Sequence, residues 1–148
     1  MPRIVREAKA TWQGNVARGG GVLSAATSTA FADLAFTVAS RISVPEEKTS
    51  PEELLAAAHG GCFTMSLATE LSQGGTPPTS LETRVIVTMD EVEGKGHQII
   101  HSQIEVRGEV PGCDEATFAQ AAEAADVGCP FSALIRGIAT VGVSASLA

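Results

Sequence analysis

The sequence predicts an α+β fold, in which a largely antiparallel sheet packs on one long, buried helix. Two observations favour this class: strand-like stretches follow one another in groups, and residues 53–71, ELLAAAHGGCFTMSLATEL, are small and apolar over the length of a helix. The 148 residues can bury roughly two thirds of their unfolded surface, so we expect a single domain over residues 1–148. Hydrophobic residues make up 44% of the chain and aromatic residues only 4%, so Ala, Val, Leu and Ile must build the core.

Three short strands are expected in the first part of the chain. They are AKATWQG at residues 8–14, RGGGVLSAA at 18–26 and LAFTVASRIS at 34–43. Gly19, Gly20 and Gly21 predict a tight turn between the first two strands. Residues 44–50, VPEEKTS, are polar and contain a proline, which is typical of a connector before the long helix.

The long helix has a clear start signal. Ser50 can cap its N-terminus, Pro51 suits the first helical position, and Glu53 at the third position completes a capping box. The helix is expected to end near Ser72, before the GGTPP segment at residues 74–78. Because its residues are small or apolar on almost every side, we expect this helix to be buried all round.

A hairpin and three further elements complete the predicted fold. Residues 81–92 and 97–110 alternate polar and apolar side chains and are joined by the turn EGKG, which predicts an antiparallel hairpin. Residues 111–128 suit a second helix, capped by Asp114 and closed by Gly128. The remaining elements are a short helical turn at 129–137 and a closing strand at 138–148.

Charge and apolar pattern exclude two kinds of partner. The net charge is −7 at pH 7, and the chain has no basic stripe that would bind a nucleic-acid backbone. No apolar run approaches the ~20 residues needed to span a bilayer, so no membrane partner is expected. Residues 1–12, MPRIVREAKATW, lack the continuous apolar region of a signal peptide, which predicts a cytoplasmic protein.

Three cysteines, at positions 62, 113 and 129, are the first candidates for chemistry. Their odd number and the lack of a CxxC pair fit neither a secreted disulfide framework nor a zinc knuckle. Cys129 directly precedes Pro130, which places it near the N-cap of the short helical turn, where free N–H groups stabilise a thiolate. Cys62 lies in the middle of the long helix, so its thiolate would need another positive group. Composition equally allows both cysteines to fill gaps in an alanine-rich core.

His59 lies three residues before Cys62 and shares a face of the long helix with it. This spacing suits a metal-binding pair or a base beside a nucleophile. It suits a core histidine that is hydrogen-bonded to backbone at least as well. His97 and His101, beside the second hairpin strand, are expected to face solvent.

Arg18 and Arg41 are isolated arginines among small or apolar residues, and surface placement is the ordinary interpretation of each. Glu52, at the mouth of the long helix, can pair with one of them. Glu52 and Cys62 are ten residues apart, an axial rise of about 15 Å. A shared site would therefore need a long arginine side chain or a bend at Gly60 and Gly61.

Two distant motifs contain the candidate cysteines: TSPEELLAAAHGGCFTMSLATEL at residues 49–71 and VGCPFSALI at residues 127–135. Together with the opening ATWQGNVARGGG and the segment VPGCDEATFAQ, they resemble the OsmC/Ohr family over essentially the whole chain. The helix motif and the opening segment are closer to the OsmC branch than to the Ohr branch.

The resemblance implies a thiol-dependent peroxidase that reduces organic hydroperoxides and, more weakly, hydrogen peroxide, in defence against oxidative and osmotic stress. By motif, Cys62 matches the peroxidatic cysteine, whose thiolate attacks the peroxide, and Cys129 matches the resolving cysteine, which forms a disulfide with it. A lipoyl-type dithiol would restore the reduced enzyme, and no cofactor or metal is implied. Glu52 matches the family's glutamate, and both Arg18 and Arg41 match arginines that can activate the thiol.

The resemblance also implies an intertwined homodimer, with two long central helices and sites built from both subunits. Such a dimer would supply a partner for a helix that is apolar all round. The sequence departs from the family pattern in three places: Ser50 replaces asparagine, Gly60 and Gly61 replace a more helix-favouring pair, and Cys113 matches no family cysteine. The two glycines leave room beside Cys62 for an apolar peroxide or for a second helix.

Two other functions stay open at the level of sequence. A Cys–His hydrolase or acyl-transfer enzyme would use His59 as the base for Cys62, and it would need a third group to orient the histidine. A zinc-binding or small-ligand-binding protein would use His59, Cys62 and Cys129 as ligands.

Overall fold

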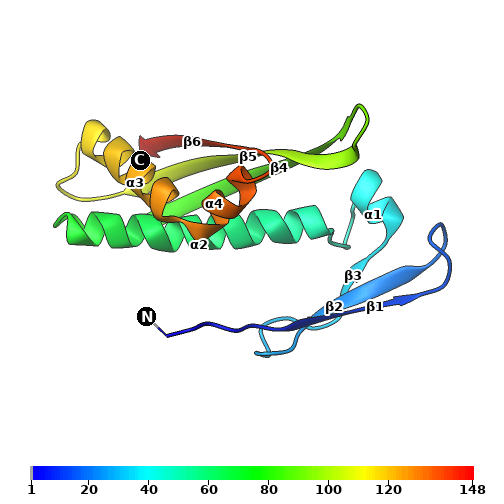
Figure 1. Ribbon diagram of the computed structural model, residues 1–148. Coiled ribbons are helices and arrows are strands. Elements are labelled where there is room, and N and C mark those ends of the chain that lie inside the picture. Colours follow the sequence, from blue (N-terminus) through cyan, green and yellow to red (C-terminus); the bar gives the residue numbers. More distant parts are fainter. Residues whose placement is uncertain (1) are drawn as a thin grey trace. The chain divides into compact units, whose positions relative to one another are not determined.

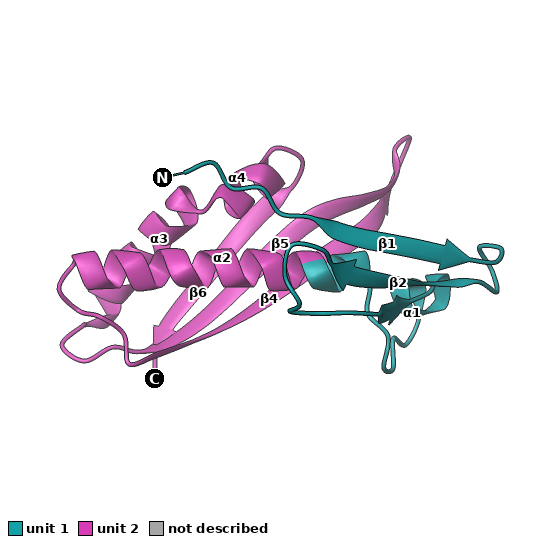
Figure 2. Ribbon diagram, turned by 90° about the horizontal axis from the view of Figure 1, so that it is seen from below, with its two compact units in different colours: residues 1–54 teal, residues 55–148 magenta. Residues whose placement is uncertain are grey.

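Six strands and four helices make up residues 2–148, the part of the chain that the computed structural model describes (Figure 1). In chain order they are β1 (Ala8–Gln13), β2 (Gly20–Ala25), β3 (Leu34–Phe36), α1 (Val38–Ile42), α2 (Pro51–Gln73), β4 (Ser80–Val92), β5 (Gly96–Glu109), α3 (Glu115–Gly128), α4 (Pro130–Arg136) and β6 (Thr140–Leu147). Figure 2 shows the two compact units of the chain, residues up to Leu54 and residues from Leu55 onward. The predicted α+β class is confirmed, and the single domain over residues 1–148 stays a prediction.

The first unit contains an antiparallel sheet in the order β1-β2-β3. The predicted turn at Gly19–Gly21 is wrong in position, because Gly20 and Gly21 already lie in β2, opposite Gln13 and Trp12. The turn begins earlier, at Gly14, whose φ of +86° suits glycine. Gly21 is needed for packing, since a Cβ there would lie 2.6 Å from the ring of Phe36.

The third predicted strand, residues 34–43, is correct only over Leu34–Phe36. The rest of it forms the short helix α1, which the sequence pattern missed. Thr37 Oγ1 accepts a hydrogen bond from the Ser40 N–H at 2.9 Å, and Ser40 Oγ accepts one from the Thr37 N–H at 2.9 Å. This reciprocal capping box starts a helix in spite of the β-branched residues that follow it.

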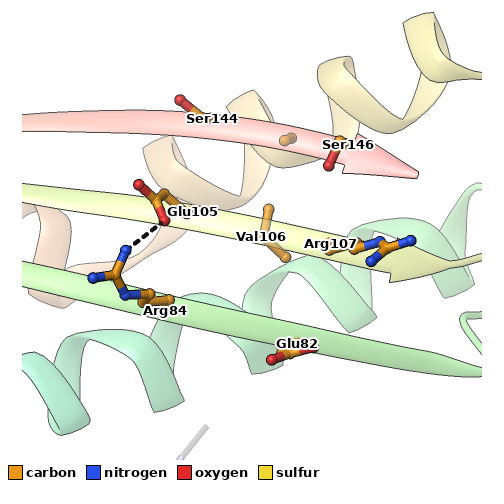
Figure 3. A pocket seen from close by; sticks show the side chains of 8 residues that line it. Glu82, Arg84, Glu105, Val106, Arg107, Ser144 and Ser146 are labelled. Atoms are coloured by element: carbon orange, nitrogen blue, oxygen red, sulfur yellow. Dashed lines mark hydrogen bonds and ion pairs between the residues drawn. The ribbon is translucent and has the colours of Figure 1, made fainter. Parts of the chain in front are cut away.

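The second unit contains a mixed sheet in the order β4-β5-β6, in which β4 and β5 form the predicted antiparallel hairpin and β6 runs parallel to β5. A register shift interrupts the hairpin between Thr88 and Met89. The helices of this unit lie behind the sheet in Figure 3, against one of its faces. The core between them contains Phe63, Leu67 and Leu71 of α2, Ile104 and Val106 of β5, and Phe118, Ala122 and Ala125 of α3.

Helix α2 begins and ends where the sequence predicts. Ser50 Oγ accepts a hydrogen bond from the Glu53 N–H at 3.2 Å, and Gly75, with φ of +84°, follows the end of the helix. The expectation that α2 is buried all round is wrong for a single chain. Its buried residues are His59, Phe63, Leu67 and Leu71, which recur every fourth position and form one stripe. The opposite face is exposed and contains Ala58, Gly61, Met65 and Thr69.

Cys129 lies at the junction of two helices. Asp114 caps α3 as predicted, with Oδ1 accepting from the Thr117 N–H at 2.7 Å. Gly128 is the last residue of α3, and Cys129 is both the C-cap of α3 and the N-cap of α4, with Pro130 in the first turn.

Among residues 2–148, no helix is both long enough and apolar enough to cross a lipid bilayer.

Candidate active site

Cys62 and Cys129 are brought together by the fold of the second unit. Their Sγ atoms are 3.3 Å apart although 67 positions separate them in the sequence. Cys129 is fully buried, Cys62 is half-buried, and both are free thiols. Helix α2 positions Cys62, and the junction of α3 and α4 positions Cys129. The pairing that the cysteine motifs imply is therefore geometrically available.

The surroundings of Cys62 within this unit favour the protonated thiol. Burial raises the pKa of Cys62, and the hydrogen bond with the Cys129 thiol raises it further. The backbone N–H of Phe131 lowers this pKa, but its effect is the smaller one. Cys62 therefore requires a cation if it is to react as a thiolate at neutral pH, as its position in the middle of a helix predicts.

His59 is a fully buried core histidine, but its partners differ from the predicted backbone groups. Nδ1 lies 2.8 Å from Ser102 Oγ on β5, and Nε2 lies 2.8 Å from Ser132 Oγ on α4. Both serines are fully buried as well. Burial lowers the pKa of His59, so the imidazole is neutral at pH 7.

This arrangement argues against both alternative uses of His59. Each ring nitrogen is occupied by a serine hydroxyl, so neither is directed at Cys62 as a base or at a metal shared with the cysteines. Within residues 2–148, no group of three or more His, Cys, Asp or Glu side chains is arranged to hold a metal ion. The sequence pattern did not single out the two serines, although Ser102 alternates with the apolar residues of its strand and Ser132 belongs to the motif around Cys129.

An ion pair between the buried Asp126 and the exposed Arg136 lies on the helices next to Cys129. Asp126, in the last turn of α3, accepts a hydrogen bond through Oδ2 from Arg136 at the end of α4. Its other oxygen, Oδ1, is buried and finds no hydrogen-bond donor among residues 2–148. The negative charge of Asp126 raises the pKa of His59 and the positive charge of Arg136 lowers it, and both effects are smaller than that of burial.

The glutamate and the arginines belong to the first unit. Arg41, on α1, donates to Glu52 Oε1 from Nε at 2.9 Å and from Nη2 at 2.5 Å. Arg18 lies in the exposed turn before β2, where its backbone N–H donates to Asn15 Oδ1 at 2.9 Å. Of the two arginines that the sequence left open, the one that pairs with Glu52 is Arg41.

The remaining cysteine and the two other histidines lie away from the Cys62–Cys129 pair in the sequence and have few polar contacts. Cys113 is half-buried, and its Sγ lies 3.5 Å from the backbone oxygen of Asp114. His97 is exposed, as expected. His101 was expected to face solvent but is half-buried, because its ring nitrogens contact Thr140 Oγ1 at 2.6 Å and Gln103 Oε1 at 3.1 Å.

The adjacent glycines before Cys62 differ in their surroundings. A Cβ on Gly60 would lie 3.2 Å from Cγ2 of Val85, so glycine lets α2 approach the sheet closely at this point. A Cβ on Gly61 would meet no atom within 4 Å. Packing inside the chain therefore explains Gly60 and leaves Gly61 unexplained.

A pocket of about 390 Å³ lies over the face of the sheet that points away from the helices (Figure 3). Its rim carries the ion pair of Arg84 with Glu105, whose atoms Nη1 and Oε2 are 3.1 Å apart. The other charged residues of the lining are Glu82 and Arg107. Neither Cys62 nor Cys129 lines this pocket, so it is separate from the candidate active site.

Comparison with known proteins identifies the family of the chain. Residues 44–144 match the family described as OsmC, OsmC-like protein. The chain is 33% identical to peroxiredoxin OsmC of Escherichia coli K12 over 138 residues, which are 93% of this chain and 94% of that protein.

Solved structures with the same fold include two named for organic hydroperoxide resistance. The protein from Legionella pneumophila has a TM-score of 0.75 at 21% identity and covers 99% of both chains. OhrB of Bacillus subtilis has a TM-score of 0.71 at 22% identity, over 95% of this chain and 98% of its own. The sequence match and the shared fold together show that the chain belongs to the OsmC-like protein family.

Proposed function

We propose that this protein is a cytoplasmic thiol peroxidase that reduces organic hydroperoxides and, more weakly, hydrogen peroxide in defence against oxidative and osmotic stress. The observation that carries the proposal is the 3.3 Å separation of the Cys62 and Cys129 sulfurs, one half-buried and the other fully buried. The relatives support it, because one is named a peroxiredoxin and others are named for organic hydroperoxide resistance.

The proposed reaction has two steps. In the first, the Cys62 thiolate attacks the O–O bond of the hydroperoxide and becomes a sulfenic acid. The alkoxide that leaves takes up the proton that the thiol lost on ionisation and departs as the alcohol. In the second, the Cys129 sulfur attacks the Cys62 sulfur, and the hydroxyl leaves as water with the proton of the Cys129 thiol. The peroxide is thus reduced by two electrons, and the two thiols are oxidised to one disulfide.

A dithiol completes the proposed cycle. Thiol–disulfide exchange with a lipoyl-type dithiol would return Cys62 and Cys129 to thiols and leave the reductant as its own cyclic disulfide. Cys62 is the sulfur open to such attack, because Cys129 is fully buried.

The proposal assigns activation of Cys62 to Arg41 and Glu52, with Arg18 as the competing candidate. The groups around Cys62 in its own unit raise its pKa, so a cation must come from elsewhere. Glu52 accepts two hydrogen bonds from Arg41, which fixes the direction of the guanidinium. A fixed guanidinium can stabilise the thiolate and polarise the peroxide.

The proposal also includes a homodimer that covers the exposed face of α2. Met65 on this face is 69% exposed, and the neighbouring position Gly61 has open space around it. A second copy of the chain would bury these apolar positions, and glycine at position 61 would allow a close approach of the second helix.

The function is tested by replacing each cysteine and measuring turnover of cumene hydroperoxide with a dithiol. We expect Cys62→Ser to reduce the rate to the uncatalysed background. We expect Cys129→Ser to form no intramolecular disulfide after the first oxidation, so that the Cys62 sulfenic acid persists until the dithiol attacks it directly and turnover is slower than in wild type. Cys113→Ser is the matched control and should remain fully active.

Mass spectrometry after one equivalent of peroxide gives the second readout. The wild-type protein should contain a Cys62–Cys129 disulfide and be lighter by the two thiol hydrogens. Full activity of the Cys62→Ser protein would refute the proposal, and a disulfide that uses Cys113 in its place would reassign the resolving cysteine.

A further inference from the structure

Besides the hydrogen bond between the Phe131 N–H and Cys62, two side-chain links join α2 to α4 side by side in the second unit. One is the pair of sulfurs, Cys62 Sγ and Cys129 Sγ, 3.3 Å apart. The other is the hydrogen bond between His59 Nε2 and Ser132 Oγ, 2.8 Å long. His59 precedes Cys62 by three residues, and Ser132 follows Cys129 by three residues, so each link lies one helical turn from the other.

The hydrogen-bonded link is buried and directional. His59, Ser132 and Ser102 have no exposed surface, so each polar atom depends on its partner in the protein. A neutral imidazole donates from one ring nitrogen and accepts at the other, and the two serine hydroxyls can serve either arrangement. Ser102 on β5 thus holds the imidazole ring at Nδ1, and the ring in turn holds Ser132 on α4 through Nε2.

The side chain of Cys129 makes few contacts that would direct its sulfur toward Cys62. It is the N-cap of α4, but its side chain makes no capping hydrogen bond to that helix. Its contact with Cys62 is the only side-chain hydrogen bond found for it within residues 2–148. The position of its sulfur relative to α2 is therefore set by the placement of α4. The Phe131 N–H holds the start of α4 at Cys62, and Ser132 in its first turn gives the side-chain anchor.

We propose that His59 is a positioning residue for disulfide closure: by binding Ser132 it keeps the start of α4 in register with α2, so that the Cys129 sulfur faces the oxidised Cys62. This inference rests on the proposed peroxidase function. The bond that forms has an S–S length of about 2.05 Å, so the two sulfurs must approach by more than an ångström from their present separation of 3.3 Å. The sulfenic hydroxyl leaves as water with the Cys129 proton, as in the second step of the cycle.

Two substitutions of His59 separate the two hydrogen bonds. In His59→Gln the side-chain amide reaches the position of Nε2 and can still bind Ser132. In His59→Asn the amide reaches only the position of Nδ1 and can bind Ser102 alone. Ser132→Ala and Ser102→Ala form a second matched pair, because each removes one hydroxyl from an equally buried site.

The test is a single-turnover experiment with one equivalent of cumene hydroperoxide. Samples are quenched over time, sulfenic acid on Cys62 is trapped with dimedone, and mass spectrometry follows the sulfenic acid and the Cys62–Cys129 disulfide separately. We expect His59→Asn and Ser132→Ala to slow disulfide closure about tenfold, the effect of losing one buried hydrogen bond. Formation of the sulfenic acid should stay within about twofold of wild type, as the hydrogen bond acts on the later step. His59→Gln and Ser102→Ala should close at nearly the wild-type rate.

Two results would overturn the inference. One is wild-type closure in Ser132→Ala, and the other is equal slowing of both steps, which would indicate a general loss of structure. Failure of the proposed function gives a different result, because the wild-type protein would then form no sulfenic acid with the peroxide.

A peroxide-free measurement keeps the inference testable in that case. Equilibration in glutathione redox buffer gives the equilibrium constant of the Cys62–Cys129 disulfide without any peroxidase step. We expect this constant to be about tenfold lower in Ser132→Ala than in wild type or Ser102→Ala. Equal constants in the three proteins would overturn the inference.

Discussion

At the scale of single residues, the second unit contains a histidine that burial keeps neutral. His59 accepts at one ring nitrogen and donates from the other, and both partners are buried serine hydroxyls. Protonation would remove the accepting nitrogen and place a charge among buried groups. Burial accordingly lowers the pKa of His59 from its ordinary value of 6.5.

The lowered pKa predicts a loss of stability in mild acid. The unfolded chain takes up a proton near pH 6.5, whereas the folded protein does so only at lower pH. The contribution of neutral His59 is therefore complete above pH 6.5 and is lost as the pH falls through the lowered pKa. We expect the free energy of unfolding of wild type relative to His59→Gln to fall as the pH is lowered from 7.5 to 5.5. Urea titrations of both proteins at each pH measure this difference in the free energy of unfolding. A difference that stays constant with pH would contradict the prediction.

The two arginines allow a paired prediction at the same scale. Removing a cation that stabilises a thiolate raises the pKa of the thiol, so Arg41→Ala should slow alkylation of Cys62 about tenfold at neutral pH. Arg18→Ala, which removes the same charge from the exposed turn, is the matched control. Iodoacetamide labelling, resolved for the Cys62 peptide, measures both rates. A larger effect of Arg18→Ala would transfer the activating role to Arg18.

The site shows why some residues were predictable and others were not. Cys62, Cys129 and Glu52 lie in contiguous motifs whose local signals, a helix start and a proline turn, survive in the structure. Ser102 matters because the fold brings β5 against α2, and spacing along the chain contains no information on that contact. The pairing of Glu52 with Arg41 likewise depends on α1, which the sequence pattern missed.

At the scale of elements, the sequence prediction failed where a local capping box starts a short helix. The stretch after Phe36 has β-branched residues that suit a strand, yet the Thr37 and Ser40 side chains satisfy each other's backbone N–H groups and start α1. Long elements were placed correctly, because α2, β4 and β5 have sustained patterns and clear ends. The parallel pairing of β6 with β5 was not predictable from the alternation of polar and apolar residues. This alternation is the same in parallel and antiparallel edge strands.

The cap of α1 is testable with a reporter in the same unit. Thr37→Ala removes the hydroxyl that accepts from Ser40, and we expect it to lower the stability of the first unit by about 1 kcal/mol. Thr37→Ser keeps the hydroxyl and should be close to wild type. Trp12, the single tryptophan, packs 5.6 Å from the ring of Phe36, so its fluorescence follows this unit in urea. Equal midpoints for the alanine and wild-type proteins would exclude a stabilising cap.

At the scale of the whole molecule, one long helix has more apolar surface than a single chain covers. Helix α2 buries one stripe against its own unit and leaves Ala58, Gly61 and Met65 exposed on the other side. The expectation of burial on all sides came from composition, which reports how apolar the helix is but not which molecule covers it. The proposed second copy of the chain would reconcile the composition with the exposed face. It would also account for Gly61, beside which the single chain leaves open space.

We expect a charge on the exposed face of α2 to disrupt the proposed dimer. Met65→Glu would place a carboxylate in the apolar contact between two copies, where desolvation without a partner costs several kcal/mol. Gln120→Glu adds the same charge on the exposed side of α3 and is the matched control. Light scattering after size-exclusion chromatography should show a dimer for wild type and Gln120→Glu and a shift toward monomer for Met65→Glu. A monomeric wild-type protein, or a Met65→Glu protein that dimerises like wild type, would remove this face of α2 from the proposed interface.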